Sequence, residues 1–205
     1  MRSNTIFFHA AVGIHPEYAE EATAENLTRI EAMLLHEKVA ALGEIGLDYH
    51  WDEPPRDIQR EAFERQLKLA VRLDIPVIIH SRDATEDTMR LLAQYRPKGV
   101  MHCFSGSAET AKEVVKLGMY VGFTGVVTFK NARRALEAAA VVPIDRLLLE
   151  TDCPYMAPVP FRGKRTTSDM IAYSAEVLAR VKGISAQELI DRTRENAMRL
   201  FNISL

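Results

Sequence analysis

Six short runs of apolar and β-branched residues recur along the chain, and each run ends at polar residues. The runs cover Ala10–Pro16, Val39–Asp48, Pro76–Asp83, Gly99–Gly106, Tyr120–Gly125 and Arg146–Pro154. Runs of this length and composition are typical of buried strands. We therefore predict six strands, separated by segments with a helical pattern.

Helical periodicity is clearest between the second and third runs. Within Glu61–Leu73, apolar residues fall on one helix face at Phe63, Leu67, Ala70 and Val71. A second helical segment, Ala108–Leu117, is followed by Gly118, a residue that often ends helices. The sequence Ser185-Ala-Gln-Glu188 is a capping box, and residues 168–205 predict two capped helices that pack on the outside of the sheet.

Alternating strands and helices favour a parallel sheet of βαβ units. The strand ends recur about every 27 residues, close to the ~31 residues per unit of an eight-stranded (β/α) barrel, and a doubly wound sheet fits the same spacing. No glycine-rich phosphate loop follows a predicted strand, which disfavours nucleotide binding. Because no linker or break in composition interrupts the chain, we predict one α/β domain over residues 1–205.

Composition and charge narrow the choice of function. Hydrophobic residues make up 47% of the chain and charged residues 26%, which is enough to fill a core. The net charge of -2 excludes binding to polyanions by overall charge, so any contact with nucleic acid must come from a local basic patch. Two cysteines give no disulfide framework, and no apolar run approaches the ~18 residues of a membrane span. We expect a cytoplasmic protein with no membrane partner.

Metal-binding residue types recur near the carboxyl ends of four predicted strands. They are Glu44, His80, His102 and Asp152. In barrel enzymes the catalytic residues lie at this end. Two histidines and two carboxylates suit Zn²⁺, Mn²⁺ or Mg²⁺ and hydrolytic chemistry, with one or two ions per chain. We predict that the four side chains converge on a divalent metal, with Asp152 as general base and Glu44 as a second catalytic carboxylate.

Each of these residues alone also has a structural interpretation. A single histidine at a strand end is more often hydrogen-bonded than bound to a metal, and the recurrence in four units is what favours the metal. Cys103 and Cys153 directly follow two of the candidates, so strand alternation turns them toward the helices. We predict buried structural thiols there, with a ligand role as the lesser alternative. We expect His9, His36 and His50 in structural or surface positions.

Several motifs, in their order and spacing, resemble those of the TatD-type metal-dependent deoxyribonucleases. The motifs are GIHPE (13–17), GEIGLDYH (43–50), IPVIIHSRDA (75–84), MHCFSG (101–106), YVGFTG (120–125), LLLETDCPYMAP (147–158), PFRGKR (160–165) and ENAMRLF (195–201). That family belongs to the amidohydrolase-like (β/α)₈ TIM barrels. The resemblance implies two divalent metals that hydrolyse phosphodiester bonds, typically as a 3′→5′ exonuclease acting on DNA.

The same resemblance implies a role for each candidate ligand. Glu44 is similar to the carboxylate that bridges the two metals. His80 and His102 match the two histidines of one metal. Asp152 matches the carboxylate that holds the other metal and orients the attacking water.

The chain departs from the family pattern at its N-terminal end. The family begins with a strand that ends in a metal-binding His-x-His pair, followed by a second βα unit, and neither precedes GIHPE here. We therefore predict a barrel that lacks its first two βα units, either through an internal start or as a natural fragment. Because such a sheet leaves two edges open, we expect a chain less stable than longer relatives, or a homo-oligomer that covers the edges.

Basic residues near the same rim are candidates for binding DNA or a small phosphate ester. Arg82 lies at the end of the third strand, and Arg162, Lys164 and Arg165 follow the last strand. A solvated turn explains the last three equally well. His15, at the end of the first strand, is placed to touch substrate.

Three functions stay open at this point. The first is a metal-dependent phosphodiesterase or deoxyribonuclease, impaired by loss of the His-x-His pair. The second is a catalytically silent barrel fragment that acts in oligomerisation or partner binding. The third is hydrolysis of C–N or lactone bonds, since a fold and its metals do not fix the substrate. Arg82 and the basic loop favour phosphate esters.

Overall fold

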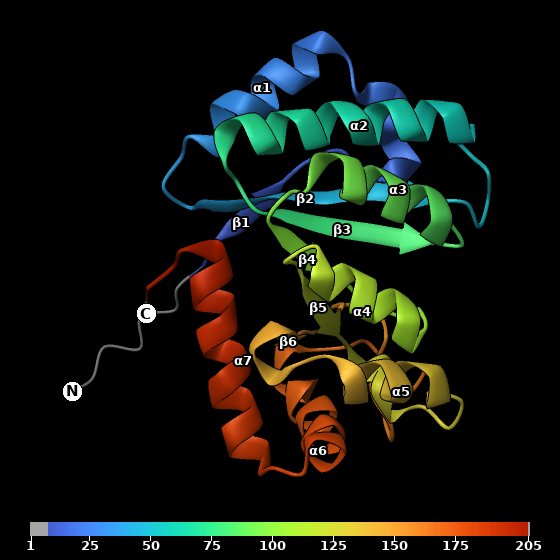
Figure 1. Cartoon of the computed structure of the whole chain (residues 1–205), viewed down its shortest axis with the longest axis vertical. Coiled ribbons are helices and arrows are strands. Elements are labelled where there is room, and N and C mark those ends of the chain that lie inside the picture. The colour runs from blue at the N-terminus through green and yellow to red at the C-terminus, as the bar shows by residue number, and fades with distance from the viewer. Residues whose placement is uncertain (1–7, 205) are drawn as a thin grey trace.

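Six parallel strands form one sheet in the computed structural model, which describes residues 8–204 (Figure 1). The strands are β1 (Ala10–Val12), β2 (Val39–Asp48), β3 (Val77–Arg82), β4 (Gly99–Met101), β5 (Tyr120–Phe123) and β6 (Leu147–Leu149). They lie side by side in sequence order, and every neighbouring pair is parallel. The six predicted strands and the α/β class are therefore confirmed.

Helices connect the strands and cover the sheet. The α-helices are α1 (Ala24–Leu34), α2 (Arg56–Leu73), α3 (Thr85–Tyr95), α4 (Ala108–Lys116), α5 (Arg133–Val141), α6 (Ile171–Lys182) and α7 (Ala186–Phe201). Short 3₁₀ turns are η1 (Pro16–Glu21), η2 (Gly125–Thr128), η3 (Ile144–Arg146) and η4 (Ser168–Met170). Because each helix returns the chain to the same edge, the carboxyl ends of the strands lie together. None of the helices within residues 8–204 has both the length and the apolar character needed to cross a membrane.

Local sequence signals begin and end these helices largely as predicted. The Ser185 hydroxyl accepts a hydrogen bond from the Glu188 N–H at 3.1 Å, which starts α7. α4 stops just before Gly118, whose φ of 85° suits a residue without a side chain. Three of the four apolar residues predicted to face the core from α2, Phe63, Leu67 and Ala70, are buried. The fourth, Val71, is 46% exposed, so the prediction included one residue too many.

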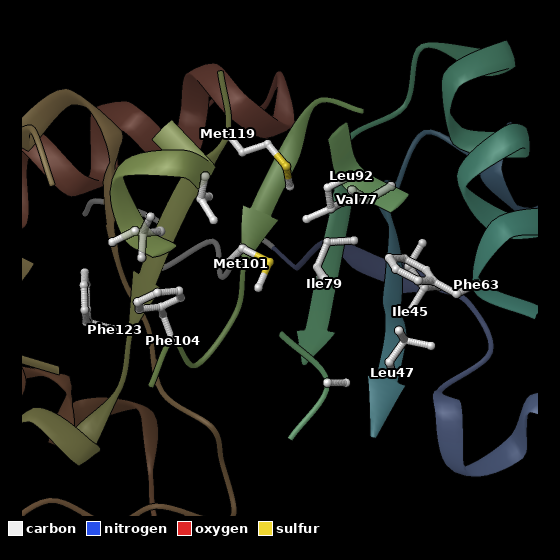
Figure 2. Packing of buried hydrophobic residues seen from close by; sticks show 14 of the residues in the cluster. Ile45, Leu47, Phe63, Val77, Ile79, Leu92, Met101, Phe104, Met119 and Phe123 are labelled. Carbon is white, nitrogen blue, oxygen red and sulfur yellow. The ribbon is translucent and has the colours of Figure 1, made fainter. Parts of the chain in front are cut away.

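The main hydrophobic core lies between the sheet and the helices that follow its strands. Figure 2 shows part of this core, with Ile45, Leu47, Phe63, Val77, Ile79, Leu92, Met101, Phe104, Met119 and Phe123 labelled. Ile45 and Leu47 alternate along β2 with residues that point the other way. Burying these two side chains therefore decides which residues of β2 reach the opposite face of the sheet.

That opposite face carries a second, smaller apolar cluster. Val100, Tyr120 and Leu148 are buried there, one each from β4, β5 and β6. They are covered by side chains from the last turns of α7, namely Ala197, Leu200 and Phe201. The prediction that both C-terminal helices pack outside the sheet is therefore wrong for the end of α7. The reason is that apolar side chains on this face need a cover where no opposing strand supplies one.

The sheet is not closed into a barrel. Within the described residues, β1 pairs only with β2, and β6 pairs only with β5. The architecture is consistent with a TIM-barrel-like sheet of six strands, as predicted. Coverage of the two edges by a second copy of the chain stays a prediction.

Asn196 attaches α7 to the segment that leads into β6. Its buried Nδ2 donates to the carbonyl oxygens of Ile144 at 2.7 Å and Leu147 at 2.9 Å. We expect Asn196→Ala to lower the free energy of unfolding by about 2 kcal/mol, because two carbonyl groups lose their donor. Urea denaturation measures the change. Glu195→Gln, on the exposed side of α7, is the matched control, and an equal loss in both variants would contradict this role.

Candidate metal centre

A β-bulge places Glu44 on the inner face of the sheet. The register between β2 and β3 shifts between Leu42 and Ile45, where β2 holds one extra residue. Beyond the bulge, Ile45 faces the main core, so Glu44 and Asp48 share the opposite face. Glu44 therefore lies in the middle of β2, not near its end as predicted, and the bulge directs its carboxylate toward the neighbouring strands.

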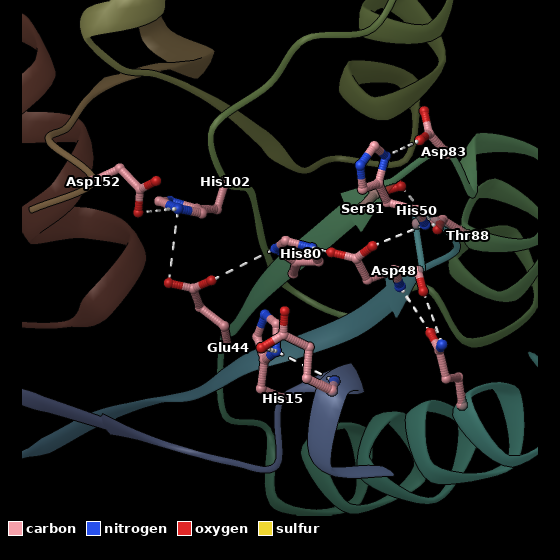
Figure 3. A network of polar contacts seen from close by, with 12 residues as sticks. His15, Glu44, Asp48, His50, His80, Ser81, Asp83, Thr88, His102 and Asp152 are labelled. Carbon is pink, nitrogen blue, oxygen red and sulfur yellow. Dashed lines mark hydrogen bonds and ion pairs between the residues drawn. The ribbon is translucent and has the colours of Figure 1, made fainter. Parts of the chain in front are cut away.

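His80 lies between the carboxylates of Glu44 and Asp48 (Figure 3). Its Nε2 is 2.9 Å from Asp48 Oδ2, and its Nδ1 is 3.8 Å from Glu44 Oε2. A carboxylate only accepts hydrogen bonds, so Nε2 carries the proton and Nδ1 keeps a lone pair facing Glu44. Close approach of the two strands requires glycine opposite His80, because a Cβ on Gly46 would lie 1.9 Å from the His80 carbonyl oxygen.

His102 has the same arrangement on the other side of Glu44. Its Nδ1 is 3.1 Å from Glu150 Oε1, an oxygen that also accepts the Cys103 N–H at 2.6 Å. Its Nε2 is 3.7 Å from Glu44 Oε1 and 3.5 Å from Asp152 Oδ1. Glu150 therefore orients the ring and leaves Nε2 facing Glu44 and Asp152.

Glycine on the neighbouring strand makes room for Glu150. Because Glu150 follows β6, its side chain passes over the inner face of β5 to reach His102. A Cβ on Gly122 of β5 would lie 2.3 Å from Glu150 Oε1. Gly122 is therefore part of the site although it offers no ligand atom.

The four predicted ligands converge, and the spaces between their donor atoms fit a cation. The N···O separations around Glu44 and between His102 and Asp152 are 3.5 to 3.8 Å, longer than normal hydrogen bonds. Two donor atoms that each lie ~2.0–2.2 Å from the same ion are separated by about this distance. A mixed set of imidazole and carboxylate donors suits Zn²⁺ and Mn²⁺ better than Mg²⁺, which prefers oxygen ligands.

Charge around His102 also favours a cation. Burial lowers the pKa of His102, but the Asp152 and Glu150 carboxylates outweigh burial and raise that pKa to about 11. In return, the ion pair with His102, 3.5 Å away, lowers the pKa of Asp152. A divalent ion competes with the proton for Nε2, so metal binding releases that proton.

His15 reaches the same group of side chains from the end of β1. Its ring centroid lies 4.6 Å from that of His80, in an edge-to-face contact. Burial lowers the pKa of His15, and the neighbouring His80 adds to this effect, so the ring is neutral at pH 7. His15 thus lies on the rim as expected from its strand end, while its contact with substrate stays a prediction.

Two buried glutamines of α2 hold the backbone at the ends of β1 and β2. Gln66 exchanges two hydrogen bonds with the backbone of Ile14, at 2.8 and 3.0 Å. Gln59 exchanges two with the backbone of Asp48, both at 2.8 Å. Because the two glutamines are two helical turns apart, they lie on one face of α2. The helix therefore fixes the residue before His15 and the residue that orients His80.

The predicted positions of both cysteines are wrong. Cys103 is half-buried, and its Sγ belongs to a group of donor atoms with His102 and Asp152 that lie within 4.8 Å of one another. Strand alternation fails here because β4 ends at Met101 and Cys103 has a φ of 44°. Burial raises the pKa of the Cys103 thiol to about 11, which keeps it protonated and disfavours a ligand role at neutral pH. Cys153 is exposed in the loop after β6.

The predicted phosphate-binding residues lie in two places, one at the end of β3 and three on the loop after β6. Arg82 is the last residue of β3, and its side chain is exposed. Arg162, Lys164 and Arg165 are exposed on a loop, where the Arg162 guanidinium lies 4.0 Å from the centroid of the Phe129 ring. Within residues 8–204, no hydrogen bond or ion pair connects this loop to the four predicted ligands. The structure therefore brings Arg82 to the rim, while a role of the loop in binding substrate stays a prediction.

Sequence reasoning missed the residues that orient the ligands. Asp48 and Glu150 lie an even number of residues from Glu44 and Asp152, and this spacing on one strand face could have identified them. Gln59 and Gln66 occupy the buried face of α2, where a polar residue needs a partner. Both glutamines lie at helical spacing from the apolar residues of α2, and this spacing could have predicted that they are buried.

A parallel sheet of barrel type, with histidines and carboxylates gathered at the carboxyl ends of its strands, defines the class of metal-dependent hydrolases. The family described as TatD related DNase matches residues 2–202, and the chain belongs to this family. It is 49% identical over 201 residues to the metal-dependent hydrolase YabD of Bacillus subtilis, covering 97% of this chain and 79% of the relative. It is 42% identical over 206 residues to YcfH of Escherichia coli K12, also named a metal-dependent hydrolase, covering 98% and 76%.

A solved structure shares the fold closely. The crystal structure of YjjV, a TatD homologue from Escherichia coli K12, superposes with a TM-score of 0.89 at 35% identity, covering 96% of this chain and 77% of that one. The predicted family is thus confirmed, and the protein is a metal-dependent hydrolase of the TatD family. The predicted N-terminal truncation is not supported, because the family match begins at residue 2 and covers nearly the whole chain.

The carboxylate of Asp48 allows a direct test of how His80 is held. We expect Asp48→Asn to weaken Zn²⁺ binding by about 10- to 100-fold, because the neutral amide no longer raises the basicity of His80. Isothermal titration calorimetry measures the affinity. Asp83→Asn removes an exposed carboxylate that lies 3.1 Å from His50 and is the matched control. Equal affinity in wild type and Asp48→Asn would contradict the orienting role.

Proposed function

We propose that this protein hydrolyses the phosphodiester bonds of DNA, removing nucleotides from the 3′ end. The observation that carries the proposal is the convergence of Glu44, His80, His102 and Asp152 in a chain of the TatD related DNase family. Divalent ions in such a centre lower the pKa of bound water from ~15.7 toward ~7 and stabilise charge on the phosphoryl oxygens.

The side chains of the centre supply the proton transfer and its geometry. Asp152 stays ionised because the ion pair with His102, 3.5 Å away, lowers its pKa, so it is able to accept a proton from the attacking water. Glu44 faces His80 with one oxygen and His102 with the other, which keeps the two halves of the centre at a fixed separation. Both roles depend on the imidazoles that face these carboxylates, and Asp48 and Glu150 orient those rings.

A polar pocket beside His102 supports an anionic substrate. The pocket has a volume of about 100 Å³, and its polar lining comprises His102, Arg134, the hydroxyl groups of Ser81, Thr85, Ser105 and Thr110, and one carboxylate, Asp83. Arg134 on α5 was not among the predicted phosphate-binding residues. Together with Arg82 at the end of β3, it provides positive charge for the phosphoryl oxygens.

Two exposed aromatic side chains support a nucleic-acid substrate. Trp51 is 68% exposed in the loop after β2 and makes an edge-to-face contact with His50, with ring centroids 4.6 Å apart. Tyr155 is 69% exposed in the loop after β6. Both loops leave the carboxyl edge of the sheet, where the ligands lie. Exposed aromatic rings stack on unpaired bases, and this contact favours single-stranded DNA over a small phosphate ester.

Digestion of a labelled oligonucleotide tests the proposal. With Mg²⁺, Mn²⁺ or Zn²⁺ present, we expect a 5′-labelled single strand to shorten progressively from its 3′ end. EDTA should abolish cleavage, because the centre then has no ion to activate water. Glu44→Gln, purified in the same way, controls for contaminating nucleases. Cleavage that does not exceed both controls with any of the three metals would contradict the proposal.

Trp51 separates recognition of bases from the hydrolytic step. We expect Trp51→Ala to raise the KM for single-stranded DNA about tenfold, since a stacked base contributes ~1–3 kcal/mol. Hydrolysis of bis(p-nitrophenyl) phosphate, which has no base, should be unchanged. Leu35→Ala, which removes an exposed apolar side chain just after α1, is the control. An unchanged KM for DNA in Trp51→Ala would exclude stacking at this position.

A further inference from the structure

Positive side chains gather on the loops that follow β5 and β6 and on the first turn of α5. They form a group that we call the basic surface, and all six are exposed: Lys130, Arg133, Arg134, Arg162, Lys164 and Arg165. Within residues 8–204, Glu137 is the one carboxylate that forms an ion pair with any of them, with Arg133 at 2.8 Å. Six cations against this carboxylate give +5, so the rest of a chain with a net charge of -2 carries -7.

The two loops form one surface because they are hydrogen-bonded and closely packed against each other. The Val159 N–H, from the loop after β6, donates to the Thr128 hydroxyl in η2 at 2.8 Å. Glycine at position 125 allows the close approach, because a Cβ on Gly125 would lie 2.2 Å from the Met156 carbonyl oxygen. Cations from the two loops are therefore presented together.

Aromatic rings hold two of these cations. The Arg162 guanidinium lies 4.0 Å from the centroid of the Phe129 ring, and Lys164 Nζ lies 5.8 Å from that of Phe161. Phe161 in turn makes an edge-to-face contact with Tyr173, with 5.1 Å between the ring centroids. Stacking uses the flat face of a guanidinium and leaves the N–H donors at its edge free for phosphate oxygens. Because a solvated turn would leave these side chains unrestrained, the contacts favour a binding role for the loop.

The first turn of α5 connects the basic surface to the metal centre. Arg134 lines the pocket that also contains His102. The neighbouring Arg133 lines a groove of about 470 Å³ beside α5, together with Phe129 and Lys130. The groove has the size of a ligand site, ~300–1,000 Å³, and the rest of its lining is mostly apolar. The cations therefore follow one path, from the pocket beside the centre across α5 to the loop after β6.

The start of α5 is an unfavourable place for two positive charges. The amino end of a helix already carries a partial positive charge, which acidic side chains stabilise and basic ones do not. Arg133 and Arg134 are the first two residues of α5, and the helix has neither an acidic residue in its first turn nor a side-chain cap. A bound polyanion would relieve this repulsion.

We propose that the basic surface binds the phosphate backbone of a single-stranded nucleic acid that extends from the metal centre across α5 to the loop after β6. Evenly spaced phosphates match a line of cations, and the apolar lining of the groove suits unpaired bases. An acidic peptide offers the charge without the bases. The choice of ligand rests on the proposed function, but binding of the strand does not require its cleavage.

Strand binding in the absence of cleavage tests the proposal. A fluorescein-labelled single strand of ~12 nucleotides is titrated with the full chain in EDTA, and anisotropy gives the Kd at several salt concentrations. We expect Lys130→Gln/Arg162→Gln to weaken binding about tenfold and to reduce the slope of log K against log salt by about 1.4, at ~0.7 for each lost phosphate contact. Lys38→Gln/Arg192→Gln removes the same charge from exposed positions that form no ion pair within residues 8–204, and should bind like wild type.

Two further variants separate charge from structure. Arg162→Lys keeps the positive charge and loses the stacked guanidinium, so its salt dependence should equal that of wild type. Arg134→Gln removes a charge that repels the helix dipole, so we expect it to bind the strand more weakly while its melting temperature equals or exceeds that of wild type. A purely structural role of Arg134 would lower the melting temperature instead.

Equal affinity and equal salt dependence in wild type and Lys130→Gln/Arg162→Gln would overturn the proposal. A poly-glutamate of equal length that binds as tightly, through the same two residues, would overturn the assignment to nucleic acid. Strand binding that depends on the basic surface, in a protein that cleaves no DNA with any metal, contradicts only the proposed function. Conversely, cleavage of DNA by a protein whose strand binding is unaffected in the double variant contradicts only the present inference.

Discussion

The Glu44 carboxylate lies 3.8 Å from His80 Nδ1 and 3.7 Å from His102 Nε2, and the bulge that puts it there determines the geometry of the whole centre. On either side, the second nitrogen of each imidazole is fixed by a further carboxylate, Asp48 or Glu150. Carboxylates and imidazoles therefore alternate across the carboxyl half of the sheet. Such a row concentrates negative charge in a partly buried place, and a divalent cation balances that charge better than protons do.

The sequence predicted the strands and the convergence of four candidate ligands because both follow simple periodicities. Apolar runs mark buried strands, and polar residues that end them mark the open edge of a parallel sheet. The same rules could not predict the bulge at Glu44, because one extra residue leaves no mark in hydrophobicity. They also failed at Cys103, where the chain has already left β4 and alternation no longer applies. Asp48 and Glu150 share a strand face with candidate ligands, but the spacing alone does not separate a carboxylate that orients a ligand from one that faces solvent.

The two faces of the sheet carry different kinds of residues. One face is packed entirely against helices and supplies most of the hydrophobic stabilisation. The other is divided along its length: the carboxyl half carries the polar centre, and the amino half carries the apolar cluster of Val100, Tyr120 and Leu148 under α7. This division keeps the charged groups away from the helix that covers the unclosed side. It explains how an open sheet is able to hold a polar site on the face that a barrel would enclose.

The spacing between Gln59 and Gln66 in α2 determines where the ends of β1 and β2 lie relative to each other. Residues two turns apart are separated by about 10.5 Å along a helix axis and face nearly the same direction. Gln59 and Gln66 transmit this spacing to the two strand ends through four hydrogen bonds. One residue inserted between them would rotate one amide by about 100° away from its strand, whereas an insertion before Gln59 or after Gln66 would leave both in place. The helix thus sets the distance between the two strand ends, and it tolerates an insertion outside the Gln59–Gln66 segment but not within it.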